Sequence, residues 1–260
     1  MKLIILLFSV SLSISAIAQT STTDQPTLDD IFSVKETFKY EVKYGFFKLG
    51  WVEVILLPDT MYNGKMHKHL FTKIESNSKI PFMSKEIDHF HSLFYENEDG
   101  LPVTSYYWRD NVDENKYKDI IYSFDRENGV VTYLEEDNTR DTLQLEEPAT
   151  AGHIIFYFSR LFAGGEIENK MPVYVTKKKG AILFKNPSKV EKRKYEAFDK
   201  PINAYLTTGS TENIEGPFGF SGEFRAWFMD DDLRVPLEAR VKVIIGNAIV
   251  KLIEYKREEL

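Results

Sequence analysis

Four of the five histidines in this 260-residue chain occur as two closely spaced pairs. His67 and His69 form one pair, and His89 and His91 form the other. Residues two apart in a β-strand face the same side of a sheet, so each pair could offer two imidazoles to one metal ion. Neighbouring strands would bring all four rings together. Imidazole nitrogens suit zinc, copper or nickel, so a metal-dependent hydrolase is one hypothesis for this chain.

Two carboxylates, Asp88 and Glu86, lie beside the second pair and could complete such a site. In the alternative interpretation the histidines occupy ordinary surface positions of a sheet whose other face is core, filled by Leu70 and Phe90. Lys68 then points inward, which fits neither interpretation. The chain matches no motif with known metal-ligand spacing. We therefore assign no catalytic, cofactor-binding or metal-ligating residue and expect a protein that is not an enzyme.

A run of three aspartates, residues 230–232, lies between two apolar stretches and raises the same question. Calcium or magnesium could bind there, but adjacent residues in a strand point to opposite sides and make poor co-ligands. Residues 94–108 have the same layout, in which leucine, proline and a returning strand follow an acidic turn. Asp and Asn stabilise turns by bonding nearby backbone. The repeated layout favours two acidic hairpin turns, with Pro102 and Pro236 at strand starts.

The composition excludes several classes of function. The chain has no cysteine, which rules out thiol chemistry and thiolate metal sites. Its formal net charge is −7, and an acidic surface argues against nucleic acid as a partner. Aromatic residues are plentiful, with 19 Phe and 14 Tyr, and such residues favour β-strands and apolar-lined cavities.

The first residues predict a secretory signal peptide spanning residues 1–18. Lys2 supplies a positive start, Leu3–Val10 is apolar, and Ala16-Ile17-Ala18 is a small-x-small cleavage site. The apolar run is too short for a transmembrane anchor, and no later stretch is long and uncharged enough. An N-terminal lipid anchor requires a cysteine. We therefore expect an exported protein, periplasmic or secreted, that is not a lipoprotein.

After a polar segment at 19–35, predicted to be a flexible leader, the pattern becomes that of a single β domain at 36–260. Alternation of apolar and polar residues with period two begins at Phe38 and recurs through roughly a dozen runs. Turn signals such as Asn63-Gly64 and Asn128-Gly129 separate the runs. Glycines at 45 and 50 interrupt the first run and indicate a turn or bulge.

One segment has helical rather than strand spacing. In ATAGHIIFYFSRLFAGG, the apolar residues Ile154, Ile155, Phe158, Leu161 and Phe162 fall on one helical face. We predict an amphipathic helix of about three turns, capped at its start by the threonine at 150 and ended by the glycines at 164 and 165. Many strands with one helix predict a mainly β fold, a large curved antiparallel sheet, half-barrel or open barrel.

Several stretches together resemble DUF3108, a family of bacterial exported proteins of unknown function. They are FKYEVKYGFFKLGWVEVIL, IDHFHSLFYENEDGLP, GHIIFYFSRLF, KYEAFDKPINAYLTT and FRAWFMDDDLRVPLEARVKVIIGNAIVKLIEY, within residues 36–258. The family's helix often begins with an acidic residue, where this chain has Gly152-His153. The resemblance implies a periplasmic or surface protein with a strongly curved sheet, similar in outline to the half-barrels of lipoprotein carriers. It brings no catalytic residues.

Three functional hypotheses follow. The first is a non-catalytic binding module for a lipid or another apolar envelope ligand, which requires a hollow, apolar concave face. The second is a structural or assembly protein of the envelope that acts through a protein partner, which requires a filled concave face and an exposed apolar patch. The third is the metal-dependent hydrolase that uses the histidine pairs.

The predicted signal peptide leads to a direct test. Expression of the whole chain in a bacterium should yield an exported protein that begins at Gln19, as measured by N-terminal sequencing and intact mass. Because signal peptidases require a small residue at the cleavage position, Ala18→Leu should leave residues 1–18 attached. An exported wild-type protein that retains Met1 would contradict the prediction.

Overall fold

The structure is a computed structural model that describes residues 25–80, 84–165, 168–187, 189–214, 222–242 and 247–259. The predicted signal peptide and residues 19–24 of the predicted leader lie outside the described residues. The strands are β1 (Val34–Tyr44), β2 (Phe47–Tyr62), β3 (Lys65–Ser76), β4 (Ile87–Glu96), β5 (Pro102–Asn111), β6 (Lys116–Asp125), β7 (Val130–Leu134), β8 (Arg140–Gln144), β9 (Thr150–Ala151), β10 (Asn169–Val175), β11 (Lys178–Lys185), β12 (Val190–Arg193), β13 (Ile202–Glu212), β14 (Glu223–Met229), β15 (Pro236–Lys242) and β16 (Asn247–Glu259).

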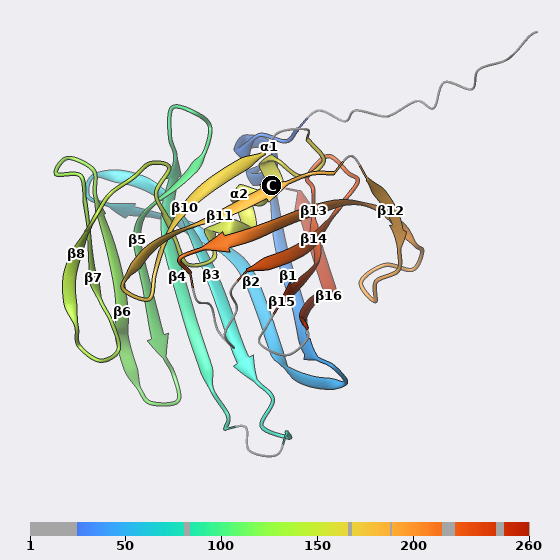
Figure 1. Cartoon of the computed structure of the whole chain (residues 1–260), viewed down its shortest axis with the longest axis horizontal. Helices are drawn as coiled ribbons and strands as arrows, with labels where there is room; N and C mark the ends of the chain where they lie inside the picture. The colour runs from blue at the N-terminus through green and yellow to red at the C-terminus, as the bar shows by residue number, and fades with distance from the viewer. Residues whose placement is uncertain are drawn as a thin grey trace, which may run out of the picture.

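These described strands form one 16-stranded sheet in the order β8-β7-β6-β5-β4-β3-β2-β1-β16-β15-β14-β13-β11-β10-β9, with β12 paired to β13. The sheet is strongly curved and unclosed, since β8 and β9 at its two ends do not pair (Figure 1). The predicted fold class, a mainly β protein with a large curved antiparallel sheet, is confirmed. The short pairing of β9 with β10 is parallel, unlike the rest.

The glycine signals in the sequence have local structural causes. Asn63 and Gly64 both have positive φ, 46° and 76°, as a two-residue hairpin turn between β2 and β3 requires. Gly45, with φ 57°, turns β1 into β2. Gly50 lies where the β1–β2 register shifts, and the carbonyl of Glu75 on β3 occupies the space that a side chain would need. A glycine is therefore required there by close backbone approach.

The predicted helix is present, spans residues 152–161 and lies on the concave side of the sheet (Figure 1). It consists of a 3-10 turn (Gly152–Ile154), α2 (Ile155–Phe158) and a second 3-10 turn (Ser159–Leu161), and we refer to it as the central helix. The prediction that Thr150 caps it is wrong. The Thr150 hydroxyl donates instead to the carbonyl of Pro172 at 2.7 Å, because Thr150 is part of β9.

The predicted flexible leader needs correction from residue 25 onward. Helix α1 (Leu28–Phe32) is closed by a reciprocal capping box between Thr27 and Asp30. Leu28 and Ile31 are each only 1% exposed and belong to the main core. Two apolar residues are too few to give a helical pattern in the sequence. The surrounding Thr and Asp residues therefore suggested a loose segment.

The three aspartates form the turn between β14 and β15, as predicted. The Asp230 amide donates to the carbonyl of Asn203 at 3.0 Å, and Asp231 accepts from the Val235 amide at 3.3 Å. Asp232 lies 3.4 Å from Arg257. The matching turn between β4 and β5 is also confirmed, since the side chain of its asparagine at position 97 accepts two backbone N–H groups. Both acidic runs serve turn geometry.

A buried ion pair attaches the central helix to the sheet. Arg160, fully buried, donates to the Glu36 carboxylate of β1 at 2.7 Å and to the carbonyl of Leu233 at 2.8 Å. The second oxygen of Glu36 accepts from the Tyr255 hydroxyl of β16 at 2.7 Å. Buried charges are tolerated only when they are paired and hydrogen-bonded in this way. The helix is thereby fixed to β1 and β16, the first and last strands of the described chain.

Replacing Glu36 by Gln should lower the free energy of unfolding by about 3 kcal/mol, because the Arg160 charge stays buried without its counter-ion. Urea denaturation measures the change. The matched control is Glu258→Gln, which removes the exposed pair with Lys35 (53% and 65% exposed) and should cost less than about 1 kcal/mol. Equal effects of the two substitutions would contradict the role given to the buried pair.

Candidate functional site

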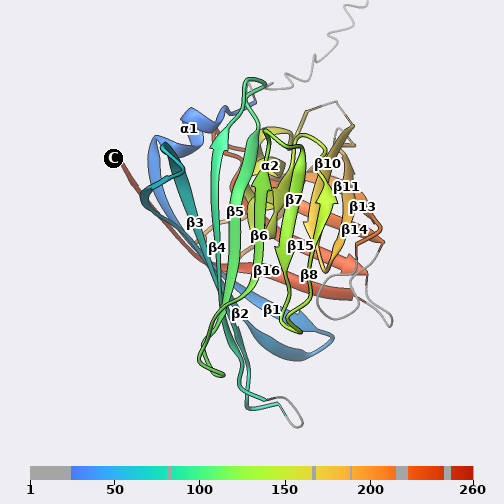
Figure 2. The same ribbon diagram turned by 90° about the vertical axis from the view of Figure 1, so that its left-hand side faces the viewer.

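The two faces of the sheet over β3–β6 have different neighbours. Tyr107 on β5 faces inward, where its ring lies against Gly152 of the central helix. Trp108, the next residue, therefore faces outward. The outer face of these strands lies toward the viewer in Figure 2. Leu70 and Phe90 pack with the inner core clusters, as predicted, so the histidines that alternate with them face outward.

The structure brings two of the four paired histidines together. Nε2 of His69 and Nδ1 of His91 lie 2.9 Å apart, so one ring donates a hydrogen bond to the other. The His91 ring stacks on Trp108, with centroids 4.4 Å apart and planes at 2°. Such a pair holds one shared proton and leaves little room between the facing nitrogens for a metal ion.

The other two histidines lie apart from this pair. His67 bonds Ser105 through Nε2 at 2.7 Å and the Lys65 carbonyl through Nδ1 at 2.9 Å. His89 packs against the ring of Phe71, with centroids 5.1 Å apart. Among the described residues, no group of three or more His, Asp or Glu side chains is placed to hold a metal ion. The four imidazoles therefore do not converge on one site.

Ser105 and His67 have the relative positions of a nucleophile and a base. Because a carbonyl can only accept, Nδ1 of His67 carries the proton, and Nε2 accepts from the Ser105 hydroxyl. However, His67 is 3% exposed and Ser105 is 8% exposed, and the rings of Tyr62 and Tyr95 flank the imidazole edge-on. Both side chains are thus almost fully shielded from solvent. The dyad is best explained as a satisfied buried hydrogen bond.

Sequence patterning did not reveal Ser105. Leu93 pairs with Tyr106 and Phe94 pairs with Thr104, so Ser105 is the extra residue of a β-bulge. The bulge turns its hydroxyl toward His67. No glycine marks this position, so the sequence carries no signal for it.

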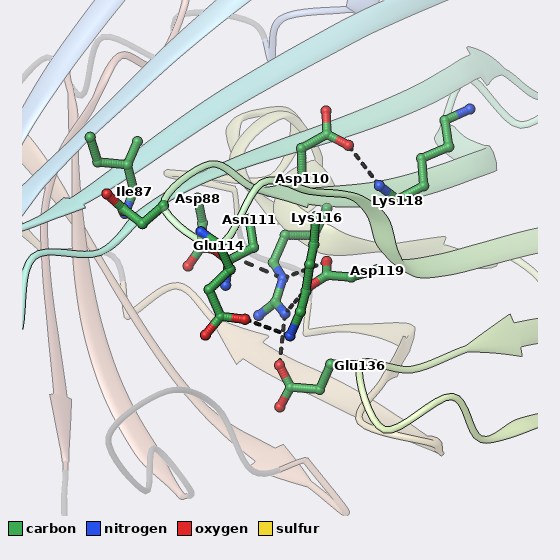
Figure 3. A network of polar contacts seen from close by, with 11 residues as sticks. Ile87, Asp88, Asp110, Asn111, Glu114, Lys116, Lys118, Asp119 and Glu136 are labelled. Atoms are coloured by element: carbon green, nitrogen blue, oxygen red, sulfur yellow. Dashed lines mark hydrogen bonds and ion pairs between the residues drawn. The ribbon is translucent and has the colours of Figure 1, made fainter.

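A polar chain runs across the strands through the histidine pair. Thr60 lies 3.4 Å from Nδ1 of His69, and Asp110 lies 3.6 Å from Nε2 of His91. Asp110 also accepts from the Lys118 amide at 2.9 Å (Figure 3). Burial lowers the pKa of His91 to about 4, with a further contribution from His69, while Asp110 opposes the shift. Burial also lowers the pKa of His69, so both rings are neutral near pH 7.

Rings form a continuous layer around this pair on the outer face. The Tyr62 and Tyr106 rings stack at 5.3 Å, and Tyr106 lies 5.4 Å from Trp108. The ammonium group of Lys118 lies 4.8 Å above the Trp108 ring. We name this layer the outer aromatic patch; its members are Tyr62, His67, His69, Phe71, His91, Tyr95, Tyr106 and Trp108. His67 and Trp108 are buried in this layer, at 3% and 9% exposed, while Tyr62, Phe71 and Tyr106 are partly exposed.

Asp88, which we considered beside the histidines, belongs to a different cluster near one end of the sheet. Arg109 donates to Asp119 at 3.0 Å and to Glu136 at 2.7 Å, and lies 3.8 Å from Asp88 (Figure 3). One guanidinium thus contacts three carboxylates and holds them together, which is a structural use of charge. Glu86, the other candidate, accepts instead from its neighbouring serine at 84.

The concave face around the central helix is filled by the chain itself. Ile154, Tyr157 and Leu161 of the helix pack with residues from both halves of the sheet, such as Phe94 and Leu237. An open hollow of about 720 Å³ lies elsewhere, over β11 and β13–β16. Six charged residues line it: Glu168, Lys185, Glu223, Arg225, Arg240 and Lys242. This lining does not suit an acyl chain, which requires apolar walls.

Comparison with known proteins identifies the family. The family model described as "Protein of unknown function (DUF3108)" matches residues 39–253. The chain belongs to the DUF3108 family. This confirms the resemblance seen in the sequence. A search of curated proteins finds no match to this DUF3108 chain.

Two solved structures resemble the DUF3108 chain. One is a β-barrel-like protein of the DUF1849 domain of unknown function from Brucella abortus, with a TM-score of 0.52, 11% identity, and coverage of 86% of this chain and 98% of that one. The other is a "putative exported protein with YmcC-like fold" from Bacteroides fragilis, with a TM-score of 0.37, 8% identity, and coverage of 85% and 95%. At these identities the first likeness shows the fold alone. Within the described part of the chain, no helix has the length and apolar character to cross a bilayer.

The histidine pair predicts acid sensitivity of the DUF3108 fold. An unfolded histidine has a pKa near 6.5, whereas the pKa of His91 is lowered to about 4 in the folded chain. Between these values the unfolded state binds the extra proton, so the free energy of unfolding falls as pH falls. Burial lowers the pKa of His153 to about 4 as well, which adds to the effect.

We expect His91→Phe, which preserves stacking on Trp108, to reduce the loss of unfolding free energy between pH 7.5 and pH 5 by about 2 kcal/mol. Urea denaturation at the two pH values measures it. The comparison at pH 7.5 serves as the control, because there His91 is neutral in both states. An unchanged pH dependence in the variant would contradict the assignment.

Proposed function

We propose that this DUF3108 protein is an exported, non-catalytic binding protein of the cell envelope that docks a protein partner on the outer aromatic patch. Of the hypotheses drawn from the sequence, this is the assembly hypothesis. The partner surface that fits has aliphatic or aromatic side chains at its centre. Acidic groups at its rim would match Lys65 and Lys118, which lie over the rings of Tyr95 and Trp108.

The proposal rests on the aromatic rings of the outer face of β3–β6. In a single antiparallel sheet this face is normally the one exposed to solvent. Tyr62, Tyr106 and Phe71 are half-buried by their neighbours and still reach the surface. Partly exposed rings that already pack on one another are ready to contact a partner, and aromatic rings dominate the energetics of protein interfaces. The neutral His69–His91 pair adds hydrogen-bonding capacity without charge.

The lipid-carrier hypothesis finds less support. It requires a hollow, apolar concave face, and the central helix with Arg160 and Glu36 occupies that position. The hydrolase hypothesis requires converging titratable groups that a substrate can reach. The histidines divide between a hydrogen-bonded pair and a buried Ser105 contact. Export of the protein is proposed from the signal peptide at residues 1–18.

Site-specific photo-cross-linking in the native host tests the proposal. Tyr106 replaced by p-benzoylphenylalanine keeps a ring in the patch and should give one discrete protein adduct on irradiation. The matched control places the same residue at Val190 on β12, which is 49% exposed and distant in the sheet order from β5. That position should give no adduct of the same mass.

The Tyr62→Ala substitution, which removes the ring stacked on Tyr106, should reduce the adduct several-fold while the fold is retained by circular dichroism. Mass spectrometry of the adduct identifies its class. A lipid adduct at position 106, or an identical protein adduct from position 190, would overturn the proposal in favour of the carrier hypothesis or non-specific contact.

A further inference from the structure

Three hairpins lie side by side at one end of the sheet. The backbone amide and side-chain amide of Asn77, after β3, donate to the carbonyls of Leu49 and Lys48 on β2 at 2.7 Å and 2.8 Å. The Val112 amide, after β5, donates to the carbonyl of Ile87 on β4 at 2.9 Å. The β1–β2 turn, the described ends of the β3–β4 connection and the β5–β6 turn therefore lie at the same end of the sheet, toward the lower side of Figures 1 and 2.

This end displays large apolar side chains to solvent. Phe46 is 88% exposed and Phe47 is 43% exposed in the β1–β2 turn, while Val112 (38%) and Tyr117 (73%) flank the β5–β6 turn. The two Phe rings lie 4.1 Å apart and pack on each other. Gly45 supplies the positive φ that this turn requires, so the neighbouring Phe46 is not needed for turn formation. Turn tips normally carry small polar residues.

Lysines surround the two phenylalanines although the protein as a whole is acidic. Lys43 and Lys48 border the turn, and both pair with Glu41, whose side chain is 6% exposed. The lysines themselves are 39% and 46% exposed. Lys79 and Lys85 on the adjacent β3–β4 connection are also exposed. Residues 43–48, 77–80 and 84–86 contain these four lysines and one acidic residue, Glu86. The β5–β6 turn differs, since it carries Asp113 and Glu114 with Lys116, so the positive charge of this end lies over the first two hairpins.

We propose that this end of the sheet is a membrane-docking surface for an anionic phospholipid bilayer. Phe46 and Phe47 insert between the headgroups, Tyr117 lies at the interface, and the lysines contact lipid phosphates. Aromatic side chains favour the boundary between headgroups and acyl chains, and each nearby lysine adds electrostatic attraction to anionic lipid. This surface is separate from the outer aromatic patch.

Sedimentation with vesicles tests the proposal on the exported form of the chain, whose intact mass is checked first. The protein should bind vesicles of phosphatidylethanolamine with phosphatidylglycerol and bind pure phosphatidylcholine vesicles weakly. High salt should weaken the binding to the anionic vesicles. Phe46→Ser combined with Phe47→Ser should lower the affinity by roughly tenfold or more, because two apolar anchors are removed.

The matched control is Met61→Ser with Met66→Ser, which removes two exposed apolar side chains (62% and 50% exposed) from the β2–β3 hairpin at the opposite end. This variant should bind as the wild type does. Phe46→Trp supplies a second readout, a blue shift of its fluorescence on addition of anionic vesicles. Equal losses in both double variants, or no vesicle binding by the wild type, would overturn the proposal. Neither variant alters the outer aromatic patch, so cross-linking at Tyr106 tests the proposed function independently.

Discussion

The ion pair between Arg160 and Glu36 fixes the central helix on the concave face of the sheet, and the use of the other surfaces depends on this. A curved sheet that does not close must cover its inner face, and the central helix of ten residues supplies that cover together with the short helix α1. The charged pair, with the Tyr255 hydroxyl as its third member, fixes the helix to the two strands at the centre of the sheet order. A buried charged pair must keep its hydrogen bonds, so the pair holds the helix in place on the sheet. The helix side chains then fill the concave face as part of the core. The outer face and the hairpin ends stay available for contacts with other molecules.

Much of the fold could be predicted from local patterns. Period-two alternation gave the strands, glycine gave the turns at 45 and 64, and the layout shared by residues 94–108 and 227–236 predicted two acidic turns. Helix α1 was missed because only Leu28 and Ile31 signal it. The Thr150 cap failed because that hydroxyl is used by the neighbouring strand β10, a tertiary contact that no local pattern encodes.

The candidate site was predictable only in part. Spacing correctly placed all four paired histidines on a face opposite Leu70 and Phe90. It could not tell that the register of β3 and β4 puts His69 beside His91. Nor could it tell that a bulge on β5 brings Ser105 to His67. The outer aromatic patch is formed by rings that lie far apart in the sequence, such as Tyr62 and Tyr106. Their contact could be seen only once the order of the strands was known.

The pairing of β1 with β16 sets a condition on how the chain reaches this structure. Val34 lies opposite Glu259, so the central ladder joins segments separated by nearly the whole described chain. Hairpins such as β2–β3 and β4–β5 need only local contacts and can form while the chain is emerging, but this ladder must wait for β16. Closing so long a loop is entropically costly, and folds of high contact order form slowly. A chain that folds late stays unfolded for longer, which is compatible with the export proposed from its signal peptide.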